Sequence, residues 1–174
     1  MLPTASSGIY DATVFKILLD YEINRSHRYV SPLALLRIVP ATALGNESKH
    51  PQAMEAITSI LNTSVRKADV PARLGDEFLV LLPNTDEPGA KIVCSRLLRV
   101  TMGTQHTPLG YSFPAAVCIG MSSHPGGPQL DAGKLMQESE LALREAVARG
   151  SQVYIAYSEI ARSNTRPTSR FNSP

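Results

Sequence analysis

Apolar side chains recur along this chain with two different spacings, and the spacings predict its elements. A repeat of three or four residues runs through Asp11–Arg25, Pro51–Val65, Ala90–Leu98 and Lys134–Arg149. Such a repeat places apolar side chains on one face of a helix, so each stretch predicts a helix with one buried stripe. The first helix is predicted to bury Val14, Phe15, Leu18, Leu19 and Tyr21. Gly150 directly follows the fourth and suits a helix C-terminus.

Short continuous apolar runs predict the strands. The run Leu33–Val39 indicates a buried strand, which Arg37 interrupts and Pro40 ends. Further strands are predicted at Phe78–Leu82, Phe113–Ile119 and Val153–Tyr157. Strands interleaved with helices and joined centrally by a hairpin favour the α/β (α+β) class, with a mixed sheet and helices packed on it.

Length and composition favour a single globular domain. The chain has 174 residues, of which 43% are hydrophobic and 18% charged, values typical of a protein with one core. We expect an N-terminal extension at 1–10, the domain at 11–160, and a polar, disordered tail at 161–174. The net charge of +2 owes much to arginines in that tail. The body has no basic excess, so no nucleic-acid partner is predicted.

Other candidate chemistry is sparse. Cys94 and Cys118 lie in apolar runs, as buried thiols do in a reducing compartment, and a disulfide is not expected. No apolar stretch approaches the roughly 20 residues that span a bilayer, and the first residues lack secretory-signal features. We therefore expect a cytoplasmic protein without a membrane partner. The histidines have no ligand spacing and are expected in exposed loops or turns: His27, His50, His106 and His124.

The segment Arg66–Pro83 carries the most specific signal. Its sequence Arg-Lys-Ala-Asp-Val-Pro-Ala-Arg-Leu-Gly-Asp-Glu-Phe, followed by an apolar run, resembles the signature hairpin of the GGDEF family with one glycine missing. Family members with an intact hairpin are diguanylate cyclases, which join two GTP molecules into the bacterial second messenger cyclic di-GMP. The R-x-x-D upstream of the hairpin is their product-binding inhibitory site.

The resemblance extends from about Asp11 to Tyr157. Matching segments occur in the family's order at Glu22–Arg25, Pro32–Leu36, Ala90–Arg99, Val117–Gly120 and Ala142–Gly150. It implies the fold of the nucleotidyl cyclase palm, a central and mostly antiparallel sheet flanked by helices.

The catalytic half resembles the family least. Family catalysis uses two divalent cations, held by an aspartate near the end of the first strand and an acid in the hairpin. The resemblance places Arg37-Ile-Val39 on the strand segment, so that Arg37 replaces the aspartate, and it leaves Asp76 and the following Glu77 as vestigial acids. A guanidinium repels Mg²⁺ and keeps its proton. No catalytic residue, metal or cofactor is therefore expected, and Mg²⁺ would matter only for residual cyclase activity.

Other parts of the substrate site also depart from the family. The double glycine is reduced to Gly75 after Leu74, so a side chain or a shortened turn is expected to obstruct the nucleotide. The family's guanine and phosphate stretches have no counterpart between Pro40 and Met54, and its closing lysine and arginine fall on Val147 and Ser151.

Simpler interpretations of these residues stay open. Asp76 and Glu77 are, in the simpler interpretation, solvated hairpin carboxylates. Arg37 either extends its head group from a strand end into water or pairs with Asp76 and replaces the metal structurally.

The product site, in contrast, is complete by resemblance. Arg66 and Asp69 match R-x-x-D, and Arg96 falls where the next helix supplies a second arginine. Arginines donate to guanine and phosphate, while an aspartate accepts from the guanine edge. The alternative is a surface ion pair between Arg66 and Asp69, three residues apart.

Three functions follow from this pattern. The first is a catalytically inactive GGDEF domain that binds cyclic di-GMP through Arg66, Asp69 and Arg96. Its partner would be a second copy of itself or another signalling domain. The second is a weakly active diguanylate cyclase, and the third is a dimerisation or scaffold module without nucleotide binding.

Overall fold

The computed structural model describes residues 8–41, 50–103, 105–106, 112–113 and 116–165. The helices are α1 (Ala12–Tyr29), α2 (His50–Ser64), α3 (Glu87–Met102), α4 (Ala132–Arg149) and α5 (Tyr157–Asn164). The strands are β1 (Leu33–Pro40), β2 (Val70–Leu74), β3 (Glu77–Pro83), β4 (Gln105–His106), β5 (Ser112–Phe113), β6 (Val117–His124) and β7 (Val153–Ala156).

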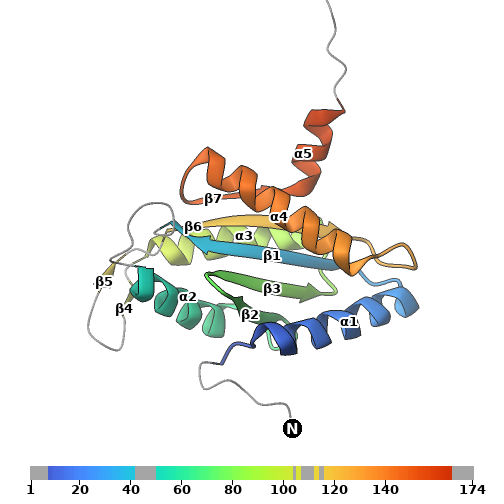
Figure 1. Cartoon of the computed structure of the whole chain (residues 1–174), viewed down its shortest axis with the longest axis horizontal. Helices are drawn as coiled ribbons and strands as arrows, with labels where there is room; N and C mark the ends of the chain where they lie inside the picture. The colour runs from blue at the N-terminus through green and yellow to red at the C-terminus, as the bar shows by residue number, and fades with distance from the viewer. Residues whose placement is uncertain (1–7, 42–49, 104, 107–111, 114–115, 166–174) are drawn as a thin grey trace, which may run out of the picture.

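A five-stranded sheet of order β2-β3-β1-β6-β7 forms the centre of the molecule (Figure 1). Its neighbouring strands are antiparallel except for β6 and β7, which are parallel. The predicted mixed, mostly antiparallel sheet is thus confirmed. The chain reaches the parallel strand β7 through α4, as a parallel pair requires.

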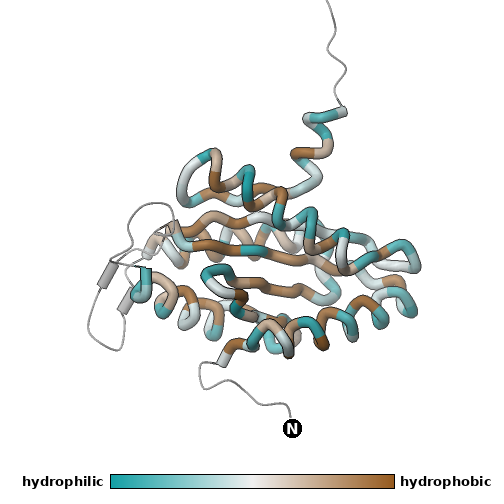
Figure 2. Tube along the Cα trace, in the orientation of Figure 1, coloured by the Kyte–Doolittle hydropathy of each residue, from teal (hydrophilic) through white to brown (hydrophobic). Residues whose placement is uncertain are grey.

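Helices cover both faces of the sheet. Alternate residues of β1, such as Leu36 and Ile38, belong to a cluster with α2 and α3, while Leu33 and Leu35 belong to a cluster with α1 and α4. Figure 1 shows α3 behind the strands and α4 in front of them. All eight positions of β1 are buried, so this central strand is apolar throughout apart from Arg37. In Figure 2 the central strands are correspondingly brown.

Aspartate caps fix where three helices begin. The side chains of Asp11, Asp86 and Asp131 accept from a backbone N–H in the first turn of α1, α3 and α4. Such a cap satisfies a donor that has no partner within the helix. α4 therefore begins at Ala132, two residues before the predicted start. It ends at Gly150 as predicted, with a φ of +125° that favours glycine.

Two predictions on α1 are wrong. The helix continues to Tyr29, four residues beyond its predicted end, and stops at Val30 in the left-handed conformation. Tyr21, assigned to the buried stripe, is 63% exposed. The buried residues of α1 are Val14, Phe15, Leu19, Ile23 and Ser26, and Tyr21 lies outside the stripe that they form.

Three further boundaries differ from the prediction. The strand expected at Phe113–Ile119 is β6, which begins at Val117 and continues to His124, and Phe113 belongs to β5. Residues 42–49, predicted as a loop, and 114–115 lie outside the described residues. Tyr157 begins α5 instead of ending β7, and α5 extends to Asn164, so the first part of the predicted tail is helical.

Both cysteines are free and buried, as predicted. Among the helices that the structure describes, none combines the length and the apolar character needed to cross a membrane.

Candidate functional site

The hairpin between β2 and β3 turns on two residues, Gly75 and Asp76. The strands pair up to Leu74 opposite Glu77, and Gly75 has a φ of +61°. Two-residue hairpins of this kind reserve the first turn position for glycine. Gly75 takes the first turn position, and Leu74 before it ends the strand with a partly exposed side chain.

Arg37 forms an ion pair with Glu77, next to this turn. Its Nη1 donates to Glu77 Oε2 at 2.7 Å, and its side chain is only 8% exposed. The hypothesis that Arg37 pairs with Asp76 is wrong. Arg37 lies opposite Leu79 in the sheet, and Glu77, two residues along, shares the face of Leu79, whereas Asp76 lies in the turn.

Asp76 points to a different partner. Its side chain is 73% exposed, and its Oδ1 lies 3.3 Å from Nε2 of His50, the first residue of α2. The solvated interpretation thus fits Asp76 but not Glu77. The prediction that the histidines lie in loops or turns is wrong for all four. His27 lies in α1, where its ring contacts the Leu130 carbonyl oxygen, and His50 begins α2. His106 and His124 end strands β4 and β6.

The donor set at this end of the sheet does not suit Mg²⁺. Arg37, Ile38 and Val39 supply no carboxylate, and the nearest acid, Glu77, is paired with a guanidinium. Within the described residues no group of three His, Cys, Asp or Glu side chains is placed to hold a metal. Mg²⁺ prefers several oxygen ligands, so these residues do not form a site for it.

Arg66 and Asp69 form a compact turn between α2 and β2. The backbone N–H of Arg66 donates to Asp69 Oδ2 at 2.8 Å, and Arg66 Nη2 lies 3.4 Å from Asp69 Oδ1. The backbone N–H of Asp69 in turn donates to the carbonyl of Arg66 at 3.0 Å. The Asp69 side chain is fully buried. Asp69 thus holds the turn, and its carboxylate is occupied by Arg66 in this conformation.

Thr85 is a member of this site that sequence reasoning missed. Arg66 Nη2 donates to Thr85 Oγ1 at 2.7 Å, and this hydroxyl donates to the Pro83 carbonyl at 3.0 Å. Thr85 follows β3 in a segment that reads only as a turn and helix entry, so no local signal identifies it. Together Thr85 and Asp69 orient a guanidinium whose side chain is 57% exposed.

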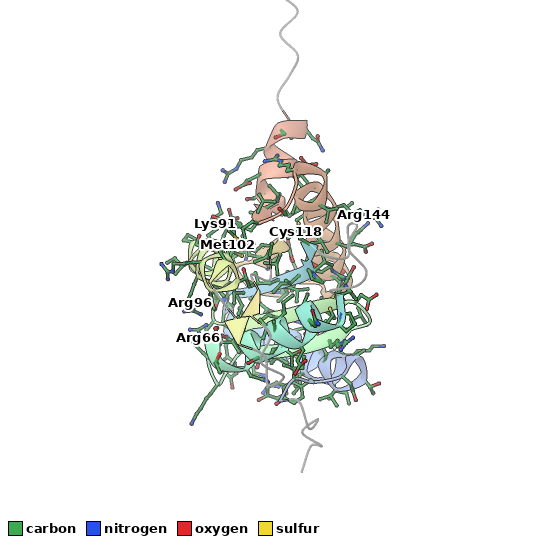
Figure 3. The ribbon with its side chains drawn as sticks, turned by 90° about the vertical axis from the view of Figure 1, so that its left-hand side faces the viewer. Arg66, Lys91, Arg96, Met102, Cys118 and Arg144 are labelled. Atoms are coloured by element: carbon green, nitrogen blue, oxygen red, sulfur yellow. The ribbon has the colours of Figure 1, made fainter. Side chains whose placement is uncertain are left out.

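Arg96 reaches the same region from α3. Its Nη2 donates to the carbonyl of Ser64, two residues before Arg66, at 2.8 Å. Its Nε is buried and has no hydrogen-bond partner among the described residues. Figure 3 shows Arg66 and Arg96 on one flank of the molecule. The three residues predicted from R-x-x-D and the next helix therefore gather at the end of α2.

This arrangement suits an anionic ligand that also carries hydrogen-bond acceptors. The guanidinium groups of Arg66 and Arg96 lie on one flank of the molecule, and that of Arg66 is oriented by Asp69 and Thr85. Guanidinium groups bind phosphate and guanine in a planar, often bidentate geometry.

Comparison with known proteins agrees with the fold and identifies the family. The family model described as "Diguanylate cyclase, GGDEF domain" matches residues 49–152, more than half of the chain. Among curated protein sequences no significant match is found.

Solved structures of similar fold include three GGDEF domains. That of YfiN (TpbB) from Pseudomonas aeruginosa is 18% identical, with a TM-score of 0.74 over 86% of this chain and 97% of that one. That of DgcB from Caulobacter crescentus, in complex with c-di-GMP, is 13% identical, with a TM-score of 0.75 over 91% and 97%. That of FimX from Pseudomonas aeruginosa is 17% identical, with a TM-score of 0.72 over 89% and 98%.

At these identities the structures show a shared fold, while the family model assigns the membership. The chain belongs to the GGDEF domain family.

Proposed function

We propose that this GGDEF domain does not turn over GTP and instead acts as a receptor for cyclic di-GMP. The observation that carries the proposal is the ion pair of Arg37 with Glu77, 2.7 Å apart. It places a permanent cation against a hairpin acid, at the end of the sheet where cyclases of this family bind their metals. A cation there opposes the metal-assisted attack that joins two GTP molecules.

The receptor half of the proposal rests on the opposite end of the same strands. Arg66 is exposed and oriented by Asp69 and Thr85, and Arg96 lies beside it with an unpartnered Nε. In the proposed complex the two arginines donate to guanine and phosphate, and Asp69 accepts from guanine once Arg66 has turned toward the ligand. The DgcB GGDEF domain, of similar fold, was solved with c-di-GMP.

Occupancy of the site would be signalled through a changed contact with a second copy of the chain or with another signalling domain.

A thermal melt tests the proposal against its rivals. At 100 times Kd, a ligand that binds only the folded state adds about 2.7 kcal/mol to the free energy of unfolding. We expect cyclic di-GMP to raise Tm, and GTP with Mg²⁺ to have no effect and yield no product. Arg66→Ala should abolish the rise, while Arg144→Ala, an exposed arginine on the opposite flank in Figure 3, should keep it.

Other outcomes identify the rival functions. Product formation from GTP and Mg²⁺ would identify a weak cyclase. An unchanged Tm with both nucleotides would indicate a scaffold or dimerisation module.

A further inference from the structure

A basic hollow on the outer side of α3 adjoins the Arg66 site. It has a volume of about 300 Å³ and is lined by Lys91, Ile92, Ser95, Arg96 and Arg99. Three of these five residues are cationic and none is acidic, so the hollow favours an anion. Arg96 belongs to both surfaces, because its Nη2 is bound to Ser64, next to the Arg66 turn.

Lys91, at the far end of the hollow, also holds the C-terminal helix. Its Nζ lies 3.1 Å from Glu87 Oε1 on α3 and 3.7 Å from Glu159 Oε1 on α5. Ser158 Oγ, at the start of α5, donates to the same Glu87 oxygen at 2.8 Å. We call these four residues the α5 clamp. The hydrogen bond to Glu87 raises the pKa of Lys91, against the opposing effect of burial, so Lys91 stays charged.

The clamp matters because none of the residues of α5 is buried. Tyr157 and Ile160, both partly buried, pack against the cluster formed by β1, α4, β6 and β7. In Figure 1 α5 stands away from the sheet. Partly exposed ion pairs are weak individually, so a ligand phosphate can displace Glu87 and Glu159 from Lys91 at little cost.

We propose that the hollow binds the phosphate groups of the ligand through Lys91, Arg96 and Arg99, and that Lys91 leaves the α5 clamp to do so. This inference rests on the proposed function for the identity of the ligand, and on the hollow itself for its phosphate chemistry. A phosphate competes with Glu87 and Glu159 for one ammonium group. Binding therefore loosens α5, and by linkage a looser α5 strengthens binding.

A probe on α5 reports this coupling directly. Ser163→Cys places a thiol on the exposed side of α5, and both native cysteines are buried, so a nitroxide label attaches there selectively. The mobility of the label is followed while cyclic di-GMP, or separately inorganic pyrophosphate, is added to the full chain. We expect mobility to rise to a plateau with either ligand.

Three variants separate binding from release. Arg99→Ala should weaken both ligands about tenfold, the loss of one charge-assisted contact, without changing the free protein's label mobility. Lys91→Met should weaken them similarly and leave α5 mobile from the start, with no further response. Glu159→Gln should tighten binding, whereas Glu145→Gln, a matched acid paired with Arg149 on α4, should not.

The outcomes distinguish this inference from the proposed function. Binding of cyclic di-GMP that depends on Arg66 but is indifferent to Arg99 and Lys91 would overturn the inference and leave the receptor intact. Pyrophosphate binding that depends on Lys91 and Arg99, with release of α5 but no response to cyclic di-GMP, would support the phosphate hollow and refute the receptor. A label that stays immobile at saturation with both ligands would overturn the coupling.

Discussion

The guanidinium of Arg37 and the carboxylate of Glu77 meet across strands β1 and β3, with Nη1 2.7 Å from Oε2. The arginine is almost fully buried and its Nε has no hydrogen-bond partner in the part of the chain that the structure describes. Among the described residues, Glu77 is thus the acceptor that pairs with this buried charge.

Removal of Glu77 should therefore destabilise the fold. We expect Glu77→Ala to lower the free energy of unfolding by about 1 to 3 kcal/mol, because a buried charged donor loses its acceptor. Arg37→Met should cost less, since the partly exposed Glu77 left behind can be solvated by water. Urea denaturation measures both. A loss for Arg37→Met as large as that for Glu77→Ala would contradict this account of the pair.

The Asp69 side chain should matter for the turn even without ligand. Asp69→Ala removes the acceptor of both Arg66 contacts, and we expect a loss of about 1 to 3 kcal/mol in the free energy of unfolding. Asp86→Ala serves as a comparison, because it removes an exposed helix cap instead of a buried acceptor. If the two substitutions cost the same and hydrogen exchange at Val70 is unchanged, Asp69 does not organise the turn.

Gly75 should resist substitution for a conformational reason. Its φ of +61° is strained for any residue with a Cβ, although an added Cβ would meet no atom within 4 Å. Gly75→Ala is expected to cost about 1 kcal/mol. Gly133→Ala, in the first turn of α4, should instead be neutral or slightly stabilising, since alanine favours the helix. Thermal unfolding should show a lower Tm for Gly75→Ala and an unchanged or higher Tm for Gly133→Ala. An unchanged Tm for Gly75→Ala would contradict the left-handed conformation of this turn residue.

Glu138 should make stability depend on pH. Burial raises the pKa of this carboxyl, and the nearby Lys134 offsets the rise only in part. The folded state therefore holds the proton of Glu138 more tightly than the unfolded chain does. The stability that this bound proton contributes is lost as pH rises through the raised pKa. We expect the difference in free energy of unfolding between Glu138→Gln and the wild type to favour the variant more at pH 7 than at pH 4. Glu140→Gln, an exposed acid paired with Arg144, is the control. A gain independent of pH would exclude titration of Glu138 as the cause.

The order of helices α1 to α4 and the mixed character of the sheet could be predicted from the sequence, because apolar spacing reflects burial directly. The mostly antiparallel arrangement was implied by the resemblance to the GGDEF family. The residues of the R-x-x-D turn could also be named. The partner of Arg37 could not, because the choice between Asp76 and Glu77 depends on strand register and turn length.

Contacts between segments far apart in the sequence could not be predicted either. Thr85 meets Arg66, and Ser158 meets Glu87, only because the sheet brings their elements together. The exposure of Tyr21 was missed because helical spacing gives the direction of a buried stripe but not its width.

The most direct test of the receptor is a calorimetric titration of the full chain with cyclic di-GMP in the absence of Mg²⁺. The account predicts a saturable heat of binding that Arg66→Ala and Arg96→Ala abolish and Arg144→Ala retains. No saturable heat from the wild-type chain, or the same heat from all four proteins, would contradict it.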